Sequence, residues 1–272
     1  MKNKIIKITR ENAEFQAFNL LKLSREKRNK EGFLFEGVRN MNNAIKYGWK
    51  IKSFFYSSEK GISEWAASII KASPESTCYD LSSGLLAKLS NKEDPSELLA
   101  IAEMPKNDLK RIPIRGDLLV VLFDSPSSPG NLGTIIRTCD ALGVHGLIVT
   151  GHATDVYDPE TISATTGSLF SVPIVRLPSQ KEVMPWIAQM KKQFPDMQVV
   201  GTDERGSSTI YEYDFRRPVI LLAGNEKRGL SIGYKESADV MIKIPMQGSA
   251  SSLNVAVATS IVLAEAKRQQ SK

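Results

Sequence analysis

The sequence predicts an α/β protein in two parts, a small N-terminal α/β domain and a larger C-terminal domain built on a mainly parallel sheet. Short apolar runs alternate with helix-like segments along the whole chain, which is typical of α/β proteins. A polar stretch with prolines at 104–116 separates the two parts. Directly after it, the apolar run 118–123 is typical of a strand buried on both faces of a parallel sheet. We therefore expect domains at 1–107 and 108–272.

The N-terminal domain alternates between helix and strand signals. Apolar residues at positions 15, 18, 20, 21 and 23 predict an amphipathic helix. It leads into an expected basic loop that carries Arg25, Lys27, Arg28 and Lys30. A strand is expected at 32–37, followed by a helix that ends before Gly48. The further elements expected are 51–56, 63–71, 77–80, 82–89 and 97–102.

The C-terminal domain repeats one pattern, in which a short apolar run is followed by a helix-like segment. These runs predict buried strands at 118–123, 146–149, 172–175, 198–201, 219–223 and 240–244. The chain ends in a small-residue, apolar helix expected at 256–266.

Composition restricts the class of protein and its partners. The chain has 36 Lys and Arg against 30 Asp and Glu, a net charge of +6 and a pI near 9.2, which suits a polyanion or an ordinary solvated surface. Cys78 and Cys139 lack the spacing of metal or redox sites and are expected to be small buried hydrophobes. No run approaches the roughly 20 apolar residues of a membrane span. We expect a cytoplasmic protein without metal or membrane.

Polar residues gather where the first strand of the C-terminal domain ends. Segment 124–138 is a loop rich in Ser, Pro and Gly that becomes a helix. We expect Asn131 at or near the N-cap and Arg137 less than two turns inside the helix, directed toward the same cleft. A capped helix with a solvated arginine is the plainer interpretation.

Two later strands end in similar loops, at a position where open α/β sheets bind ligands. Gly224 and Glu226 follow strand 219–223, and glycine there permits a tight turn or a close ligand approach. Segment 244–255 contains Ser252 and Asn254, and a buried asparagine at a helix start must find polar partners. An ordinary turn and an ordinary cap are the alternatives.

The three loops together resemble a known family. Asn131-x-Gly133-x-x-x-Arg137, then Gly224-Asn225-Glu226, then Ile244-Pro245-Met246 with Ser252-Leu253-Asn254-Val255 are similar to the three motifs of the SpoU RNA ribose methyltransferases of the SPOUT class. The resemblance runs from Leu118 to the C-terminus. The N-terminal domain is similar to the L30-like substrate-binding domain of ribosomal-RNA members, through its element order and the segment Phe35-Glu36-Gly37.

This resemblance implies a function and a set of residues. It implies a homodimeric enzyme with a trefoil-knotted catalytic domain that transfers a methyl group from S-adenosylmethionine to an RNA 2′-hydroxyl. The residues implied for catalysis are Asn131, Arg137, Glu226, Ser252 and Asn254. Those implied for the cofactor are Thr202, Gly224, Ile244 and Leu253. For RNA affinity we expect the run Arg25, Lys27, Arg28 and Lys30, with a solvated helix end as the alternative.

Other functions stay open at this point. The separate N-terminal domain favours rRNA as substrate over tRNA, and a non-catalytic RNA-binding or ribosome-assembly factor could share the fold. A different nucleotide-binding enzyme is disfavoured because neither GxGxxG nor GxxxxGK[ST] occurs. His145 and His152 lie outside the motifs, so no histidine base is offered. A guanidinium is a poor base, and we expect Arg137 to bind phosphate and favour the developing alkoxide.

Overall fold

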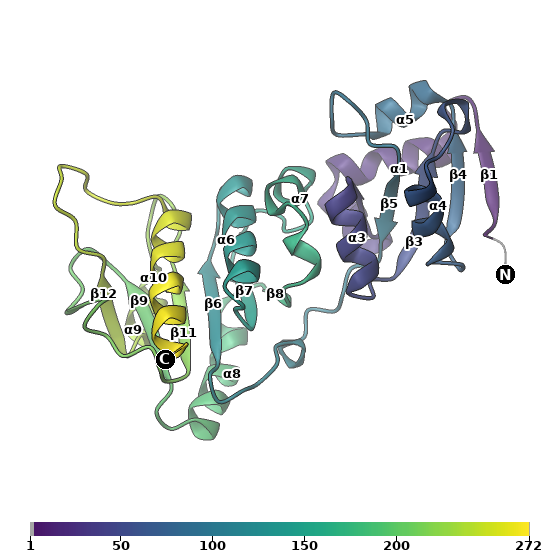
Figure 1. Ribbon diagram of the computed structural model, residues 1–272. Helices are drawn as coiled ribbons and strands as arrows, with labels where there is room; N and C mark the ends of the chain where they lie inside the picture. The colour runs from purple at the N-terminus through teal and green to yellow at the C-terminus, as the bar shows by residue number, and fades with distance from the viewer. Residues whose placement is uncertain (1–2, 272) are drawn as a thin grey trace. The chain divides into compact units, whose positions relative to one another are not determined.

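The computed structural model describes residues 3–271, which form two compact units (Figure 1). The first unit contains the chain up to Pro105 together with segment Asp155–Ser171. The second contains Lys106–Thr154 and the chain from Val172 onward. Segment Asp155–Ser171 lies within the expected C-terminal domain, so its place in the first unit differs from the prediction.

The first unit is built on a mixed five-stranded sheet in the order β1-β4-β3-β5-β2. Its strands are β1 (Ile5–Ile8), β2 (Phe33–Glu36), β3 (Ile51–Tyr56), β4 (Thr77–Leu81) and β5 (Leu99–Ala102). Strand β5 pairs antiparallel with β2 and β3, and β4 pairs parallel with β1 and β3. The helices are α1 (Ala13–Leu23), α2 (Arg25–Glu31), α3 (Val38–Lys46), α4 (Glu64–Lys71), α5 (Ser83–Leu89) and α7 (Pro159–Thr165), with 3₁₀ turns at Ser58–Lys60 and Ser168–Phe170.

The basic run after α1 is a helix and not the predicted loop. Helix α1 stops at Leu23, where the Ser24 backbone is extended. The Ser24 hydroxyl then accepts a hydrogen bond from the Lys27 amide at 3.2 Å and caps α2. A serine N-cap satisfies an amide that the first helical turn leaves free. The run therefore begins a second helix, and its four cations point in different directions around the helix axis.

Side chains of β2 point alternately to the two faces of its sheet, and this explains why segment Asp155–Ser171 belongs to the first unit. Leu34 packs into one core with Phe15 and Phe55. Phe33 and Phe35 point to the opposite face. There Phe33 contacts the Tyr157 ring, with centroids 4.6 Å apart, and Phe35 contacts the Phe170 ring at 4.8 Å. Aromatic burial on this face thus needs side chains from far along the sequence.

The second unit is built on a seven-stranded sheet in the order β10-β12-β9-β11-β6-β7-β8, and every recorded pairing is parallel. The strands are β6 (Leu119–Asp124), β7 (Gly146–Thr150), β8 (Ile174–Leu177), β9 (Gln198–Thr202), β10 (Ser208–Thr209), β11 (Val219–Ala223) and β12 (Val240–Lys243). The helices are α6 (Pro129–Ala141), α8 (Gln180–Gln193), α9 (Ile232–Ser237) and α10 (Val255–Gln270), with a 3₁₀ turn at Leu109–Arg111. The predicted parallel sheet is confirmed; the two-residue β10 was not predicted.

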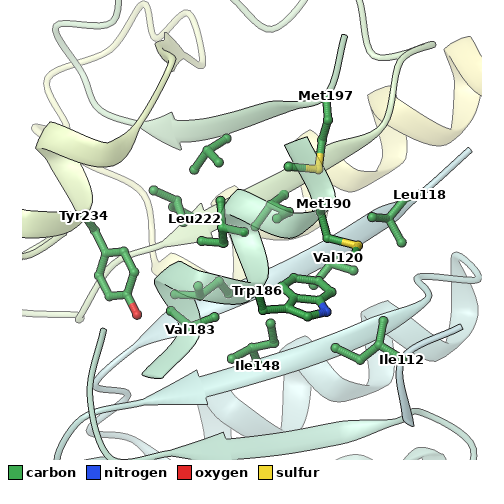
Figure 2. Packing of buried hydrophobic residues seen from close by; sticks show 14 of the residues in the cluster. Ile112, Leu118, Val120, Ile148, Val183, Trp186, Met190, Met197, Leu222 and Tyr234 are labelled. Atoms are coloured by element: carbon green, nitrogen blue, oxygen red, sulfur yellow. The ribbon is translucent and has the colours of Figure 1, made fainter. Parts of the chain in front are cut away.

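One face of this sheet packs against α8 (Figure 2). Val120 and Leu122 of β6 are fully buried against Val183, Trp186 and Met190 of α8. Each such side chain contributes about 1.5–3 kcal/mol relative to an exposed position. Helices α6 and α10 run beside each other, and the Thr138 and Ser260 hydroxyls share a hydrogen bond of 2.9 Å (Figure 1). The loops that precede these two helices are thereby brought together.

Two sequence predictions concern the whole chain. Cys78 and Cys139 are both buried, as predicted. Within residues 3–271 no helix is both long enough and apolar enough to cross a bilayer. The implied knot depends on how the chain passes through itself, which strand pairing does not describe, and it stays a prediction.

Candidate functional site

The first site loop joins β6 to α6. Ser128 is the N-cap of α6, and its hydroxyl accepts from the Asn131 amide at 3.3 Å. Asn131 therefore lies in the first helical turn, three positions after the cap, which agrees with the predicted place at or near the N-cap. Because Ser128 caps the helix, the Asn131 side chain can form hydrogen bonds with neighbouring loops.

The second loop follows β11 and is held closed by its own backbone. Asn225 and Gly229 exchange two backbone hydrogen bonds of 2.9 Å each. The Asn225 side-chain oxygen accepts from the amides of Lys227 and Arg228 at 3.0 and 3.1 Å. Its amide nitrogen donates to the Ser125 carbonyl at 2.6 Å. The Asn225 side chain thus stabilises the second loop and connects it to the first loop by a hydrogen bond.

Glu226 joins the two loops through its carboxylate. One oxygen accepts from the Ser127 amide at 2.9 Å and from the Ser127 hydroxyl at 2.6 Å. The other accepts from the Ser128 amide at 3.1 Å and from the Asn131 side chain at 3.2 Å. Partial burial opposes ionisation, but these hydrogen bonds outweigh it and lower the pKa of Glu226. Glu226 is an anchored anion and a weak proton acceptor at neutral pH.

The third loop follows β12 and ends at Asn254. Asn254 caps α10, with its oxygen accepting from the Ala256 and Val257 amides at 2.8 and 3.3 Å. Its amide nitrogen donates to the Asn131 oxygen at 3.0 Å. Asn254 is exposed, so the predicted burial is wrong. The capping alternative is correct, and the same side chain also connects to the first loop.

The second and third loops, together with the loop after β9 (202–205), border a cavity of about 810 Å³ in the second unit, and no residue of the first loop lines it. All four residues implied for the cofactor line it, namely Thr202, Gly224, Ile244 and Leu253. Three implied catalytic residues line it as well, namely Glu226, Ser252 and Asn254. Its size lies within the range of small-molecule sites, and its lining mixes apolar side chains and loop backbone with three acids (Asp203, Glu204, Glu226) and three cations (Arg205, Lys227, Lys235). A lining with both signs of charge suits a ligand that carries an aromatic base, hydroxyls and charges of both signs, as S-adenosylmethionine does.

Of the two reasons predicted for glycine at 224, the structure supports the tight turn. A Cβ at this position would lie 2.5 Å from the Gly229 carbonyl carbon and 2.5 Å from the Leu230 amide nitrogen. These atoms belong to the closing strand of the same loop. The chain's own backbone therefore excludes a side chain at Gly224, whether or not a ligand approaches.

Arg137 is not in the cavity. It is exposed on α6 and is absent from the cavity lining. Six residues separate it from Asn131, which is about 1.7 helical turns and about 9 Å along the axis. The expectation that it turns back toward the same cleft is not met in this chain, because the two side chains leave the helix on different faces.

Arg28 is buried and is not available to RNA. Its side chain is 4 % exposed and donates from Nε to the Asp155 carboxylate at 2.8 Å. Its Nη1 donates to the Leu21 carbonyl at 2.8 Å. Breaking a buried ion pair leaves an uncompensated charge, so the predicted phosphate contact at Arg28 is contradicted. Lys27 pairs with Glu31 at 2.6 Å and Lys30 with Glu26 at 2.7 Å, while Arg25 is exposed.

His145 has a structural task. Its Nδ1 accepts from the Leu119 amide at 3.0 Å, and burial lowers its pKa. A ring nitrogen that accepts a backbone hydrogen bond cannot also hold a proton, so the neutral form is favoured. His152 is exposed, and neither histidine lines the cavity.

Two residues of the site were missed as individuals. The sequence offers Asn225 only as the middle of the motif Gly224-Asn225-Glu226 and Ser127 only as part of segment 124–138, yet both hold the loops together. A signal for Asn225 is available, because asparagine side chains commonly form turns by bonding to the backbone two residues on, as Asn225 does with the Lys227 amide. No local signal points to Ser127, whose partner is 99 residues away.

Comparison with known proteins places this geometry in a family. The profile of the SpoU rRNA methylase family matches residues 118–264, and that of the SpoU L30e-like domain matches residues 12–100. The chain belongs to the SpoU rRNA methylase family. The cavity and its three loops lie within the first match, and most of the first unit lies within the second.

Relatives in the family are similar over nearly the whole chain. The 23S rRNA (uridine(2479)-2′-O)-methyltransferase of Streptomyces viridochromogenes is 46 % identical over 97 % of this chain and 92 % of its own. The Bacillus subtilis 23S rRNA (guanosine(2553)-2′-O)-methyltransferase RlmP is 28 % identical over 93 % of this chain and 95 % of its own. The crystal structure of the SpoU methyltransferase AviRb from S. viridochromogenes with AdoMet superposes with a TM-score of 0.91 at 46 % identity, covering 96 % of this chain and 99 % of that one.

Proposed function

We propose that this member of the family methylates a ribose 2′-hydroxyl of large-subunit ribosomal RNA, with S-adenosylmethionine held in the cavity that the second and third loops border. The observation that supports it most is the hydrogen-bonded chain Glu226–Asn131–Asn254, which ties one residue of each motif into a single array. A non-catalytic factor would have no need for these three side chains to meet beside a cavity.

The residues act by positioning. S-adenosylmethionine supplies an electrophilic methyl carbon when bound. Glu226 holds the Asn131 amide in one orientation, and Asn131 in turn orients the Asn254 side chain at the cavity wall. Ser252 lies on the same wall with an exposed hydroxyl that can contact the ribose. Fixed groups of this kind favour in-line approach of the hydroxyl oxygen to the methyl carbon.

Arg137 contributes from outside the cavity. A guanidinium carries a fixed positive charge, so the exposed Arg137 side chain can bind an RNA phosphate. It has no role in holding the cofactor, because it does not line the cavity.

A homodimer is part of the proposal. Helix α10 carries an apolar stripe of Val257, Ile261 and Ala264, spaced i, i+4 and i+7, in which Val257 and Ala264 are exposed and Ile261 is half-buried. Val257 is 49 % exposed. A second copy that covers this stripe would lie beside the Asn254 cap. Val257→Glu should yield monomers in sedimentation, and an unchanged dimer would remove α10 from the interface.

Methyl transfer from radiolabelled S-adenosylmethionine tests the function. The substrates are 23S rRNA from a strain that lacks the gene, 23S rRNA from the intact strain, and bulk tRNA. We expect labelling of the first alone, at a ribose that then resists alkaline hydrolysis. Arg137→Ala should keep the wild-type affinity for S-adenosylmethionine and lose most turnover, because its contact is made with the RNA. Labelling of tRNA alone would contradict the proposed substrate.

A further inference from the structure

The first unit holds a second cavity, of about 710 Å³, that the proposed reaction does not use. It is bordered by the end of β2, the start of α3, the loop around Asn91 and the start of α7. All of these belong to one unit, because α7 lies in segment Asp155–Ser171. Its volume is in the range that holds a nucleotide-sized ligand.

Three cations line the second cavity, Lys22, Arg39 and Lys92, together with three acids. Arg39 is exposed, and in the described part of the chain its guanidinium has no recorded hydrogen bond or ion pair. The Lys92 ammonium donates only to the neutral Ser96 hydroxyl, at 2.9 Å.

Two of the three acids that line the second cavity, Glu36 and Asp158, have hydrogen-bond or ion-pair partners. The buried Glu36 carboxylate accepts from the Ser90 hydroxyl at 2.9 Å, the Asn91 amide at 2.7 Å and the Ser96 amide at 3.2 Å. Asp158 lies 3.6 Å from the Arg28 guanidinium. Glu160 is the third lining acid and is exposed. Cations and acids are therefore equal in number, but the Arg39 and Lys92 side chains are exposed and make no ion pair among the described residues, so they can contact an anion such as a phosphate.

One hydrogen-bond acceptor beside the second cavity, the side-chain oxygen of Asn40, has no donor among the described residues. Asn40 donates from its amide nitrogen to the Glu36 carbonyl at 2.8 Å, which fixes the orientation of the side chain. Its Oδ1 is buried and has no hydrogen-bond partner among the described residues. Leaving such an acceptor unpaired costs about 1–3 kcal/mol, which a ligand N–H would recover if binding uncovers the oxygen.

Apolar side chains border the same space. Val38 is 54 % exposed and Leu23 is 77 % exposed, and both line the second cavity. Apolar side chains can sandwich a planar base, and an amide oxygen beside them can read the base edge. We propose that this cavity binds one unpaired nucleotide of the RNA substrate, distinct from the methylated one. The base lies between Val38 and Leu23 with an N–H on Asn40, and its phosphate lies at Arg39 and Lys92. This inference rests on the proposed function only in taking RNA as the substrate.

Filling the cavity tests the inference on the full-length enzyme. Val38→Trp should block the base, and Ile62→Trp is the matched control, because Ile62 is 42 % exposed and does not line the cavity. With unmethylated 23S rRNA we expect Val38→Trp to raise the KM for RNA at least tenfold, leave S-adenosylmethionine affinity unchanged and alter kcat little. Ile62→Trp should match wild type. An unchanged KM in a folded Val38→Trp enzyme would overturn the inference.

A charge variant keeps the test decisive if the tryptophan disturbs folding. Arg39→Gln removes an exposed guanidinium and should weaken RNA binding while reducing the slope of log K against log salt by about 0.7–0.9. An unchanged slope would refute the phosphate contact.

A free nucleotide carries the same base and phosphate as a nucleotide within RNA, so it is the alternative ligand for the second cavity. AMP, CMP, GMP and UMP should each bind the wild-type protein only weakly, in the millimolar range. Micromolar binding of any of them that Val38→Trp abolishes would overturn the RNA assignment in favour of a free nucleotide. If wild type fails to methylate rRNA at all, the proposed function fails; if it methylates and Val38→Trp behaves normally, only this inference fails.

Discussion

Replacing Gly224 by alanine tests whether the glycine serves the ligand or the fold. The added Cβ would lie 2.5 Å from two backbone atoms of Gly229 and Leu230, whereas ordinary contact begins at 3.4 Å. The closing strand of the loop must therefore move by about 0.9 Å, the difference between these two distances. Crowding of this kind typically costs about 1–3 kcal/mol. At about 2–4 °C per kcal/mol for a domain of this size, the unfolding midpoint should fall by roughly 2–12 °C.

The assay is thermal unfolding with and without S-adenosylmethionine, combined with calorimetric titration of the cofactor. Gly224→Ala should unfold earlier even without cofactor, and its cofactor affinity should fall because the displaced loop lines the cavity. Gly248→Ala is the control: Gly248 lies in the third loop, and a Cβ there meets nothing within 4 Å. It should match wild type in both measurements.

The outcome separates two explanations. If cofactor-free Gly224→Ala unfolds like wild type and yet binds the cofactor weakly, the glycine serves ligand approach and the backbone argument is wrong. If both quantities are unchanged, the loop adapts at no cost, and neither explanation holds.

Three further predictions concern charged residues. Arg28→Ala should lower the free energy of unfolding by about 3–5 kcal/mol in urea, since it strands the Asp155 carboxylate; a loss below 1 kcal/mol would show that the pair is dispensable. Because the folded-state pKa of Glu226 is depressed, its stabilising effect is present above about pH 4.3 and is lost as pH falls through the lower folded value, so Glu226→Gln and wild type should converge in acid and differ at pH 7. Arg25→Ala combined with Lys27→Ala should reduce the salt slope of RNA binding by up to about 1.4–1.8, whereas an unchanged slope would make α2 an ordinary surface.

The strands were predictable because their signal is local. Segments 118–123 and 219–223 are continuous apolar runs, and a strand buried on both faces requires that composition wherever it lies in the sheet. Helix α10 could be anticipated for a similar reason, since small apolar residues precede its basic end. The predicted starts and ends lie within a few residues of those observed.

The placement of segment Asp155–Ser171 could not be predicted from local pattern. Phe33 and Phe35 fit the usual alternation of apolar residues along a strand, and the sequence around them does not indicate Tyr157 or Phe170 as their partners. Arg28 shows the same limit. Three of its neighbours in the run are solvated or paired at the surface, and only the fold reveals that Asp155, 127 residues away, is its partner. Charged residues that are neighbours in sequence are usually interpreted as one patch, but a helix directs their side chains to different faces.

The motif residues show why a sequence signature can be recognised before its reason is known. Asn131 must donate to Glu226 and accept from Asn254 at the same time. An aspartate at position 131 would set its charge against that of Glu226, and a leucine would leave the neighbouring amide of Asn254 without an acceptor. A side chain with a donor at one end and an acceptor at the other satisfies both neighbours, and an amide of this length does so without leaving the first turn of α6. The residue type at 131 is thus set by two loops more than ninety positions away, which is why all three motifs together identify the site while each alone resembles a cap or a turn.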